Sequence, residues 1–384
     1  MSADPQIDPS ALGERLDALP GIAELRAAAG AAPAYLVGGA VRDLLRGEAR
    51  SDLDIVVESD FGPIAEALGG ELVEHERFQT ANVLVGELDV DIGRARTETY
   101  AHPGALPDVA PATIADDLAR RDFTMNAMAV PLAGEPELID PHGGLDDLRA
   151  GLLRVLHPGS FADDPTRALR AARYVARLGF ELEPETARQL RAADLETVSQ
   201  DRIIGELGKI AIEEQPSRAL ALIADWGLLD LGTAPKLAAA LERLFEADPI
   251  WAEFADRDTA ILLAIAPAER ARSLRGRAAR LSHHKTPGSP AEIHVLAHDH
   301  SAEVLAIARA AGARWLDDFA ERLRHVDLEI TGYDLIEAGV PEGPAIGRAL
   351  NAALAAKLDG TVSDRDGEFR VALAAAEEPG SATD

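Results

Sequence analysis

The hydrophobic residues of this chain follow two periodicities, and the change between them near Gly144 limits its fold more than any other feature. Up to about residue 140, short alternating apolar segments typical of strands are mixed with segments at helical spacing. Beyond Gly144, apolar residues recur at i, i+3 and i+4 over long stretches, and runs of β-branched residues are few. The sequence therefore predicts an α+β N-terminal part with a small mixed sheet, followed by an all-helical part.

Individual elements of the first part can be predicted from local patterns. The apolar run 35–37 predicts a short strand, residues 41–45 predict a helix that ends at Gly47, and residues 52–57 predict a second strand. Also expected are a helix over 64–68, strands over 71–73, 82–85 and 88–92, and a proline- and glycine-rich loop over 100–111.

Length, composition and charge exclude several classes of protein. At 384 residues and 47% hydrophobic content, the chain is long enough for two or three domains. It has no cysteine, its N-terminus is too acidic for a signal peptide, and no apolar run approaches the ~18 residues of a membrane helix. We therefore expect a cytoplasmic protein without a membrane partner. The net charge of −28 argues against general nucleic-acid coating but allows a local basic groove. The last residues, 377–384, are expected to be disordered.

The segment around Gly38 and Gly39 gives the first chemical signal. Two glycines between a strand and a helix let the backbone turn tightly and present its N–H groups to a phosphate. In the next strand, Asp52 and Asp54 point to the same side because side chains alternate with a period of two. Two such carboxylates fit divalent cations. The alternative is a solvated strand edge, since short patterns of this kind are common.

A third acid is expected from the strand 88–92, where Asp89 and Asp91 alternate with apolar residues. We assign Asp91 to the site. Nucleotidyl transfer needs carboxylates of this kind because two metal ions roughly 4 Å apart hold the attacking and leaving oxygens in line.

The segment 120–129 (RRDFTMNAMA) combines charged residues with an apolar stretch that is expected to bury Phe123 and Met128. Arg121 and Asn126 are then able to reach a triphosphate or a ribose. The alternative is a helix start with a surface ion pair, which contributes little to stability.

A third segment, 163–177, begins with Asp163-Asp164-Pro165, a pattern typical of a helix start. The arginines that follow fall within roughly a third of the helix circumference at 100° per residue. They are Arg167, Arg170, Arg173 and Arg177. Such a stripe suits an anion such as nucleotide phosphates or an RNA backbone. The alternative is a solvated basic face paired with the many acids of this chain.

Asp164 and Arg167 form a candidate pair for base selection. Cytosine and adenine both present an exocyclic amine beside a ring-nitrogen acceptor, whereas uracil and guanine present a carbonyl beside a ring N–H. A carboxylate and a guanidinium would therefore admit C and A and reject U and G, which leave buried polar groups unpaired. The competing role for Asp164 is helix capping.

These segments, taken in order, resemble the motifs of class II tRNA nucleotidyltransferases. This family comprises the CCA-adding enzymes and their bacterial poly(A) polymerase relatives in the DNA polymerase β superfamily. The matching segments are GGAVRD (38–43), DLD (52–54), RRDFTMNAMA (120–129), DPHGGLDDL (140–148), DDPTRALRAARYVARLGF (163–180) and SQDRIIGEL (199–207). A weaker likeness covers residues 330–350.

The resemblance implies a seahorse-like protein of three parts. They are a polymerase-β-like nucleotidyltransferase head (1–140), a helical neck with the base-recognition helix (141–215), and an RNA-binding helical body and tail (216–384). By position, it implies that Asp52 and Asp54 hold Mg²⁺. Among the nucleotide-binding positions it implies, Gly39, Arg42 and Arg121 would contact the triphosphate and sugar. Asp164 and Arg167 would contact the base edge, with Arg170 and Arg173 close to them. The helix of Arg202 and Glu206 would support this pocket.

The implied activity is transfer of nucleotides from CTP and ATP to the 3′ end of tRNA, with the protein in place of a template. The loop between Arg96 and Asp116 contains no lysine or arginine, so CC-only addition, A-only addition and poly(A) synthesis stay open beside the favoured CCA addition. The family commonly has Glu where this chain has Asp163. The rivals are a nucleotidyltransferase for a small molecule or protein, and a non-catalytic RNA-binding module. His283, His284 and His298 suggest either a C-terminal metal site, as in some relatives, or surface histidines.

Overall fold

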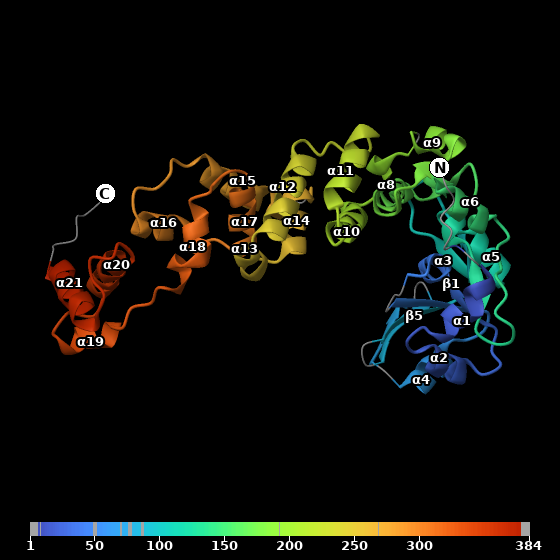
Figure 1. Cartoon of the computed structure of the whole chain (residues 1–384), viewed down its shortest axis with the longest axis horizontal. Coiled ribbons are helices and arrows are strands. Elements are labelled where there is room, and N and C mark those ends of the chain that lie inside the picture. The colour runs from blue at the N-terminus through green and yellow to red at the C-terminus, as the bar shows by residue number, and fades with distance from the viewer. Residues whose placement is uncertain are drawn as a thin grey trace. The chain divides into compact units, whose positions relative to one another are not determined.

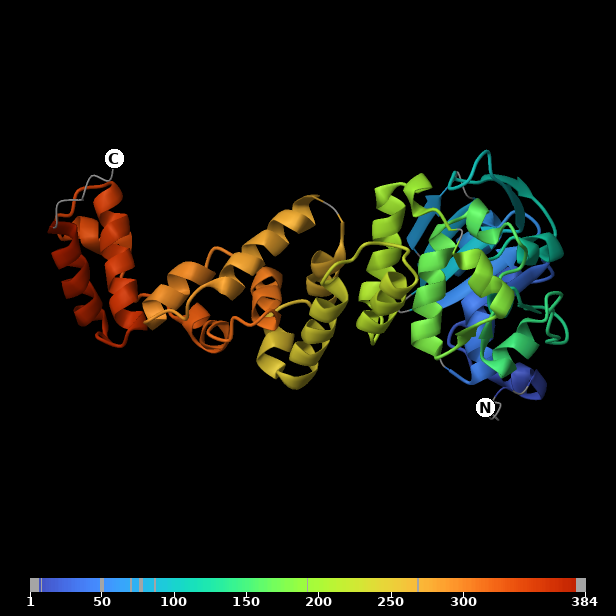
Figure 2. The same cartoon turned by 90° about the horizontal axis from the view of Figure 1, so that it is seen from above.

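The computed structural model describes residues 7, 9–48, 52–69, 71–75, 79–85, 88–191, 193–267 and 269–377. Within these ranges, the side chains of residues 52, 71–75, 85, 88 and 270 lie outside the description, as does the expected disorder over 378–384. The chain forms two compact units, the first comprising residues 1–206 and 213–230 and the second residues 207–212 and 231–384 (Figures 1 and 2). The division into head, neck, and body with tail stays a prediction.

The first unit is built on the predicted small mixed sheet, which confirms the α+β fold. The strand order is β3–β4–β5–β2–β1–β8, in which β2 and β5 run parallel and the other neighbours antiparallel. The strands are β1 (Ala34–Val37), β2 (Asp52–Val57), β3 (Glu71–His75), β4 (Thr80–Val85), β5 (Leu88–Arg94) and β8 (Ala129–Pro131). Each strand predicted over 35–92 is present within one or two residues of its expected position.

Alternation along the strands decides which face of the sheet carries the acids. Leu53 and Ile55 of β2 are buried in one core with the helices α1 (Leu12–Asp17), α2 (Ile22–Ala29), α3 (Gly38–Arg46) and α4 (Gly62–Leu68). Val56 belongs to a smaller cluster with α5 (Ile114–Ala119) on the opposite face. Because side chains alternate, Asp54 faces the same way as Val56, away from α1–α4.

The predicted loop over 100–111 is wrong in its last part. β7 (Asp108–Pro111) pairs antiparallel with β6 (Arg96–Thr99) in a separate two-stranded sheet. The pattern concealed this strand because its residues are mostly exposed and it ends on a proline, which is tolerated at a sheet edge. A second short sheet, β9 (Leu152–Leu153) with β10 (Glu181–Leu182), interrupts the region predicted as all helical.

The helix predicted to start after Asp163 is present as α8. It runs from Thr166 to Leu178, and its first turn follows Pro165 directly. Its apolar side packs into the same core as the sheet, through Ala168, Ala171 and Tyr174. The remaining helical segments of this unit are η1 (Pro9–Ala11), η3 (Thr124–Asn126), α6 (Gly144–Ala150), α7 (Ser160–Asp163), α9 (Pro184–Leu190), η4 (Leu195–Thr197) and α11 (Pro216–Asp225). Helix α10 (Gln200–Ala211) is divided between the units, since its residues from Leu207 on belong to the second.

The second unit is helical, as predicted. Its helices are α12 (Ala234–Ala247), α13 (Pro249–Phe254), α14 (Arg257–Ile265), α15 (Glu269–His283), α16 (Pro290–Ala297), α17 (Ala302–Ala310), α18 (Leu316–Glu321), η5 (Leu323–His325), α19 (Gly332–Glu337), α20 (Pro344–Leu358) and α21 (Arg365–Glu377). Trp251 is fully buried, and its indole N–H donates to Asp317 at 2.9 Å. Throughout the described residues, every helix is too short or too polar to span a membrane.

Candidate active site

The glycine turn between β1 and α3 brings a carboxylate and a guanidinium together. Gly38 has φ +68°, and a Cβ placed there would lie 2.7 Å from an Arg121 guanidinium nitrogen and 3.3 Å from Asp54 Oδ2. Only glycine satisfies both the backbone angle and this crowding. The turn is fixed further because Gly38 N–H donates to the carbonyl of Met128 at 3.3 Å.

Two acids meet across the parallel strand pair. Asp54 of β2 is the register partner of Asp91 of β5, so the two side chains lie on the same face of the sheet. Asn82 of β4 donates to Asp91 at 3.1 Å and to Asp89 at 2.5 Å. The backbone of Asp52 is the register partner of Asp89, but its side chain lies outside the described residues.

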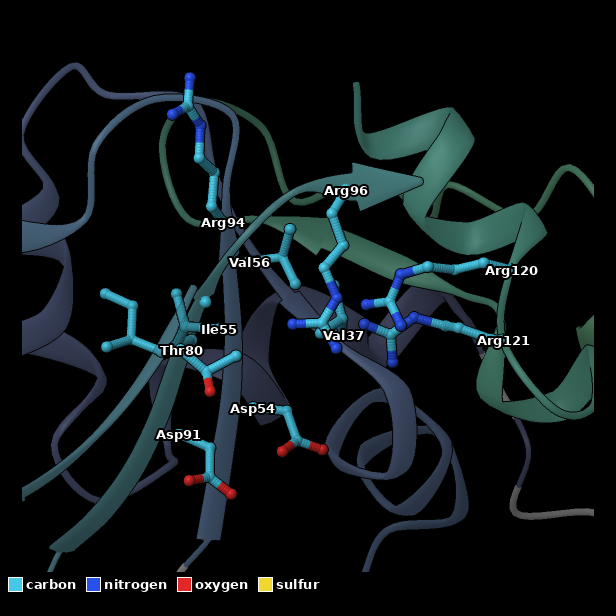
Figure 3. Close-up of a pocket in the computed structure, with 12 residues that line it drawn as sticks. Val37, Asp54, Ile55, Val56, Thr80, Asp91, Arg94, Arg96, Arg120 and Arg121 are labelled. Atoms are coloured by element: carbon cyan, nitrogen blue, oxygen red, sulfur yellow. The ribbon is translucent and has the colours of Figure 1, made fainter. Parts of the chain in front are cut away.

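Asp54 and Asp91 line one side of a pocket of about 280 Å³, and arginines line the other. Figure 3 shows the guanidinium groups of Arg96, Arg120 and Arg121 converging near Val37, with Asp54 below them. The pKa of Arg96 is lowered by burial and by the positive charge of Arg120. A site that gathers cationic groups against their mutual repulsion is suited to a polyanion.

Buried acids hold the arginine cluster in place. Asp117 is 0% exposed and accepts from Arg120 at 2.6 Å and from Arg121 at 3.0 Å. Glu98 accepts from Arg120 at 2.7 Å. Burial raises the pKa of Asp117, but the two guanidiniums outweigh that effect, and the net shift is downward. Arg96, Arg120 and Asp117 were not predicted as site residues, although the adjacent arginines in RRD were a signal for Arg120.

Arg42 and Asn126, predicted to contact nucleotide, lie in a buried network instead of the pocket lining. Arg42 is 1% exposed and donates to Asp43 at 2.8 Å and to Asn126 at 2.7 Å. Asn126 in turn donates to Asp122 at 3.0 Å. A Cβ at Gly39 would lie 3.5 Å from the Arg42 guanidinium, so this network supports the glycine turn from within the fold.

Three arginines of the α8 stripe, Arg170, Arg173 and Arg177, lie against acids, as one of the two sequence interpretations expected. Arg170 binds Asp122 through two nitrogens, at 2.6 and 2.8 Å. Arg173 donates to Glu213 at 3.1 Å and lies over the ring of Tyr174. Farther along, Arg177 lies 3.6 Å from Asp43. Nucleotide contact by Arg170 and Arg173 stays a prediction.

Asp164 and Arg167 stand at the start of α8, each with defined partners. Asp164 Oδ1 accepts from Thr166 N–H at 3.0 Å and from Arg202 at 2.7 Å, so the capping role proposed for it is present. Arg167 is 5% exposed and donates to Ser160 at 2.6 Å and to the carbonyl oxygen of Arg120 at 2.7 Å.

A second pocket of about 240 Å³ reaches Arg167, and Arg120 lines both pockets. Asp54 and Asp91 therefore line one hollow of the first unit and Arg167 lines another, and Arg120 belongs to both. The second pocket also contains His157, whose pKa is lowered by burial and by Arg167. Asp164 is absent from the described lining of either pocket.

Two protein families match segments of the chain. Residues 34–154 match the family described as Poly A polymerase head domain. Residues 179–241 match the family described as the probable RNA and SrmB-binding site of polymerase A. The first match covers the sheet, both acids and the arginine cluster.

Individual proteins are similar over longer stretches. An A-adding tRNA nucleotidyltransferase of Halalkalibacterium halodurans is 44% identical over 55% of this chain and 54% of its own length. A CC-adding tRNA nucleotidyltransferase of Deinococcus radiodurans is 34% identical over 88% of each chain. The structure of a Thermotoga maritima CCA-adding enzyme complexed with tRNA aligns with a TM-score of 0.68 and 30% identity over 97% of each chain. The chain spans about half, or less, of the length of the A-adding relatives that it matches.

Proposed function

Because the chain belongs to the tRNA nucleotidyltransferase family, we propose that it adds CCA to the 3′ end of tRNA, using CTP and ATP and no nucleic-acid template. The observation that carries this proposal is the close approach of Asp54 and Arg121 to Gly38. Both side chains have an atom within 3.3 Å of the position that a Cβ at Gly38 would take. This arrangement supports the proposal because a glycine turn, a carboxylate and a guanidinium together suit the binding of a triphosphate with its metal ions.

The arginine cluster is proposed to hold the triphosphate. Arg96, Arg120 and Arg121 converge on the pocket, and Asp117 and Glu98 fix the direction of the guanidinium forks. Planar guanidinium groups bind phosphate oxygens through paired hydrogen bonds, and preorganised groups need no rearrangement as charge develops on the departing pyrophosphate.

The acids opposite the cluster fit Mg²⁺. Oxygen ligands from one or two carboxylates, completed by substrate phosphates, are what this ion takes in nucleotide enzymes. Asp54 and Asp91 supply two such carboxylates on neighbouring strands, and Asp52 is expected to supply another. Among the described side chains, which do not include that of Asp52, no group of three potential ligands is found. A bound Mg²⁺ would neutralise phosphate charge and lower the pKa of the attacking 3′ hydroxyl.

Selection of the base is proposed for Asp164 and Arg167. Arg167 donates hydrogen bonds to Ser160 and to the Arg120 carbonyl, and the second of these ties it to the backbone that carries two of the triphosphate-binding arginines. The described contacts that fix Asp164 are hydrogen bonds from Thr166 and Arg202, and both are accepted by Oδ1. A rigid acceptor and a rigid donor can discriminate base edges because a mismatched base leaves them unpaired.

The deciding experiment uses tRNAs that end before the first C, before the second C and before A, each with CTP, ATP, UTP or GTP alone. CCA addition predicts CTP use on the first two tRNAs and ATP use on the third. Asp54→Asn should lower incorporation by at least about 1,000-fold. Asp108→Asn, a change at an exposed strand residue, is the control. Wild-type activity in Asp54→Asn would refute the assignment.

A partial activity is the second candidate. It is favoured because the similar proteins include enzymes named A-adding and CC-adding. In that case the same experiment gives incorporation with only one nucleotide. Repeated ATP addition to an unrelated RNA 3′ end would instead indicate poly(A) synthesis.

A further inference from the structure

The ring of Tyr174, on helix α8, lies against three guanidinium groups. The guanidinium carbons of Arg173, Arg42 and Arg170 lie 4.6, 5.3 and 5.7 Å from the ring centroid. A cation within about 6 Å of an aromatic ring is attracted by the negative charge on the faces of the ring. Tyr174 is 7% exposed and packs edge-on against Phe123 at 5.8 Å, so its ring is held in the core. The three cationic groups therefore gather around a fixed aromatic ring.

Two of these arginines join Tyr174 in a closed network of contacts. Arg42 donates to Asn126 at 2.7 Å, and Asn126 donates to Asp122 at 3.0 Å. Asp122 accepts from Arg170, which also donates to the Tyr174 hydroxyl at 3.3 Å. We call this set the Tyr174 network: Arg42, Asp122, Asn126, Arg170 and Tyr174. Because four of its five members are at most 7% exposed, a lost contact leaves a buried group without its partner, so each member helps to hold the others.

The Tyr174 network reaches the glycine turn through Arg42. A Cβ at Gly39 would lie 3.5 Å from one guanidinium nitrogen of Arg42, so this guanidinium packs directly against the turn. Gly39 follows Gly38, the residue that Asp54 and Arg121 approach closely. A shift of the Arg42 guanidinium would therefore be felt at the turn that is proposed to hold the triphosphate.

The partners of Arg42 differ in what they can fix. Asp43, which accepts from Arg42 at 2.8 Å, is its neighbour on α3 and moves with that helix. Tyr174 belongs to α8, so its contact with Arg42 fixes the start of α3 relative to another helix. Arg177 of α8 also approaches α3, where it lies 3.6 Å from Asp43. Of these two links between the helices, the one through Tyr174 involves the guanidinium that touches the turn.

We propose that Tyr174 is a positioning residue for nucleotide transfer, whose ring holds Arg42 against the glycine turn and so fixes the turn relative to α8. This inference rests on the proposed function for the identity of the reaction. Tyr174 acts through Arg42 and leaves the base unread, because the turn faces the phosphates that all nucleotides share. Alignment of the reacting atoms is lost with displacements well below 1 Å, so a small shift of the turn is enough to slow the transfer.

The test compares Tyr174→Leu with wild type, using the tRNA and the nucleotide that wild type incorporates. Without the ring, Arg42 gains room to move, so kcat should fall by about 10- to 100-fold, while KM for the nucleotide should change by less than about threefold. The preference for this nucleotide over UTP should be kept, because Arg167 keeps its partners. An unchanged kcat, or a preference that is lost with the rate, would overturn the proposal. If urea unfolding shows that Tyr174→Leu does not fold, the longer Tyr174→Met replaces it with the same expectations.

A conservative variant tests whether the ring is responsible. Tyr174→Phe loses the hydroxyl but keeps the ring that all three guanidiniums contact. Its kcat should therefore stay within about threefold of wild type. If Tyr174→Phe were as impaired as Tyr174→Leu, the role given to the ring would be wrong.

Phe180→Leu is the matched control for lost packing. Phe180 is 8% exposed and belongs to the same core as Tyr174. Its ring also faces an arginine, Arg46 at 5.9 Å, which pairs with Glu48 at the other end of α3 from the glycine turn. Phe180→Leu thus removes a buried ring and a cation–π contact without touching the Tyr174 network, and kcat should be kept. An equal loss of kcat would assign the effect to core packing, and the proposal would fail.

Hydrogen exchange followed by mass spectrometry tests the same inference without turnover. The amides of residues 42–45 are expected to donate to the carbonyls of 38–41, as in any α-helix, so their exchange reports on the start of α3. In Tyr174→Leu they should exchange about tenfold faster than in wild type, whereas Tyr174→Phe should keep the wild-type rates. If wild type incorporates no nucleotide yet shows this pattern, the proposed function fails and the positioning of the turn by Tyr174 stands. If wild type incorporates nucleotide but exchange is the same in all three proteins, only this inference fails.

Discussion

Gly38 shows how a single residue connects backbone geometry to chemistry. Its positive φ is a conformation that costs L-residues about 1–2 kcal/mol. Because it has no side chain, Asp54 and Arg121 can lie close to its Cα. Many glycines of this chain also have positive φ, but few of them have charged atoms this close. The effect of the positive φ can therefore be separated from the effect of the crowding by comparison with a glycine that has a positive φ and no close neighbours.

Gly38→Ala and Gly69→Ala provide that comparison. Both glycines have φ +68°, but no atom lies within 4 Å of a Cβ at Gly69. We expect each variant to lose about 1–2 kcal/mol of unfolding free energy, because the backbone strain is the same. Only Gly38→Ala should also lower the rate of nucleotide incorporation. The expected loss is about 100-fold or more, as for a site that holds the phosphates out of position. Equal activities in the two variants would show that the crowding has no functional role.

Arg167 is the residue on which base selection is expected to depend most. Arg167→Lys keeps the charge but loses the planar fork that donates to Ser160 and the Arg120 carbonyl. The preference for CTP over UTP in kcat/KM should fall by about 10- to 100-fold. Arg177→Lys, on the same helix and 3.6 Å from Asp43, should keep the preference. A preference retained in Arg167→Lys would assign base reading to other residues.

Helix α8 is tied to the segment around Asp122 through charges that depend on pH. Burial raises the pKa of Asp122, but Arg170, Asn126 and Arg167 outweigh it and lower the pKa far below its ordinary value. A depressed folded-state pKa stabilises the fold above the unfolded pKa of about 3.9, and that stabilisation is lost as pH falls further. The same sign holds for Asp117.

Acid unfolding should report this attachment. In urea titrations of the wild type, the unfolding free energy should be nearly level from pH 7 to 5 as far as these groups determine it. Below about pH 4 it should fall, by up to ~1.4 kcal/mol per pH unit for each such carboxylate. Asp122→Asn should be less stable at pH 7 and show a shallower fall below pH 4. A variant with the same slope as wild type would contradict the role given to Asp122.

At the level of elements, the sequence was informative wherever hydrophobic periodicity was strong. The strands around Leu36, Leu53 and Val90 and the helix ended by Gly47 follow from alternation, helical spacing and a glycine cap. β7 was missed because an exposed strand in a two-stranded ribbon needs no apolar face. The pairing of the α8 arginines was equally hidden, since their partners Asp122 and Glu213 are distant in sequence.

Within the site, residues marked by a local sequence pattern could be predicted, whereas roles that depend on contacts between residues distant in sequence could not. Local signals identified Gly38, Asp54 and Arg121, which the fold brings together. Whether Asn126 touches nucleotide or supports Arg42 depends on which side chains surround it, and no local pattern contains that information. The assignment of Asp91 rested on alternation alone, and the register with Asp54 now supports it.

The whole molecule consists of two units with separate hydrophobic cores. The first core is formed around the sheet, and a distinct cluster around Ile330, Leu335 and Ala349 belongs to the second unit. Nucleotide is expected to bind only the first. Ligands raise the stability of the unit that binds them, by about 2.7 kcal/mol at 100 times the dissociation constant.

Calorimetry with CTP and Mg²⁺ can test this separation. We expect two unfolding transitions, of which CTP raises the midpoint of one and leaves the other in place. In a Trp226→Phe variant, the two tryptophans that remain, Trp251 and Trp315, both lie in the second unit, so the fluorescence should follow the transition that does not move. One transition that shifts as a whole would show that the units unfold cooperatively.

Arg120 contributes to the site through two separate groups, its side chain and its backbone carbonyl. Its guanidinium lines the pocket of the acids, while its carbonyl oxygen, which is independent of the side chain, accepts from Arg167. A mutational scan replaces only side chains and so would register half of what this position contributes. The other half becomes visible when the peptide bond after residue 120 is replaced by an ester, which weakens the carbonyl as an acceptor. Tolerance of substitutions at Arg120 would thus be no sign that the position is dispensable.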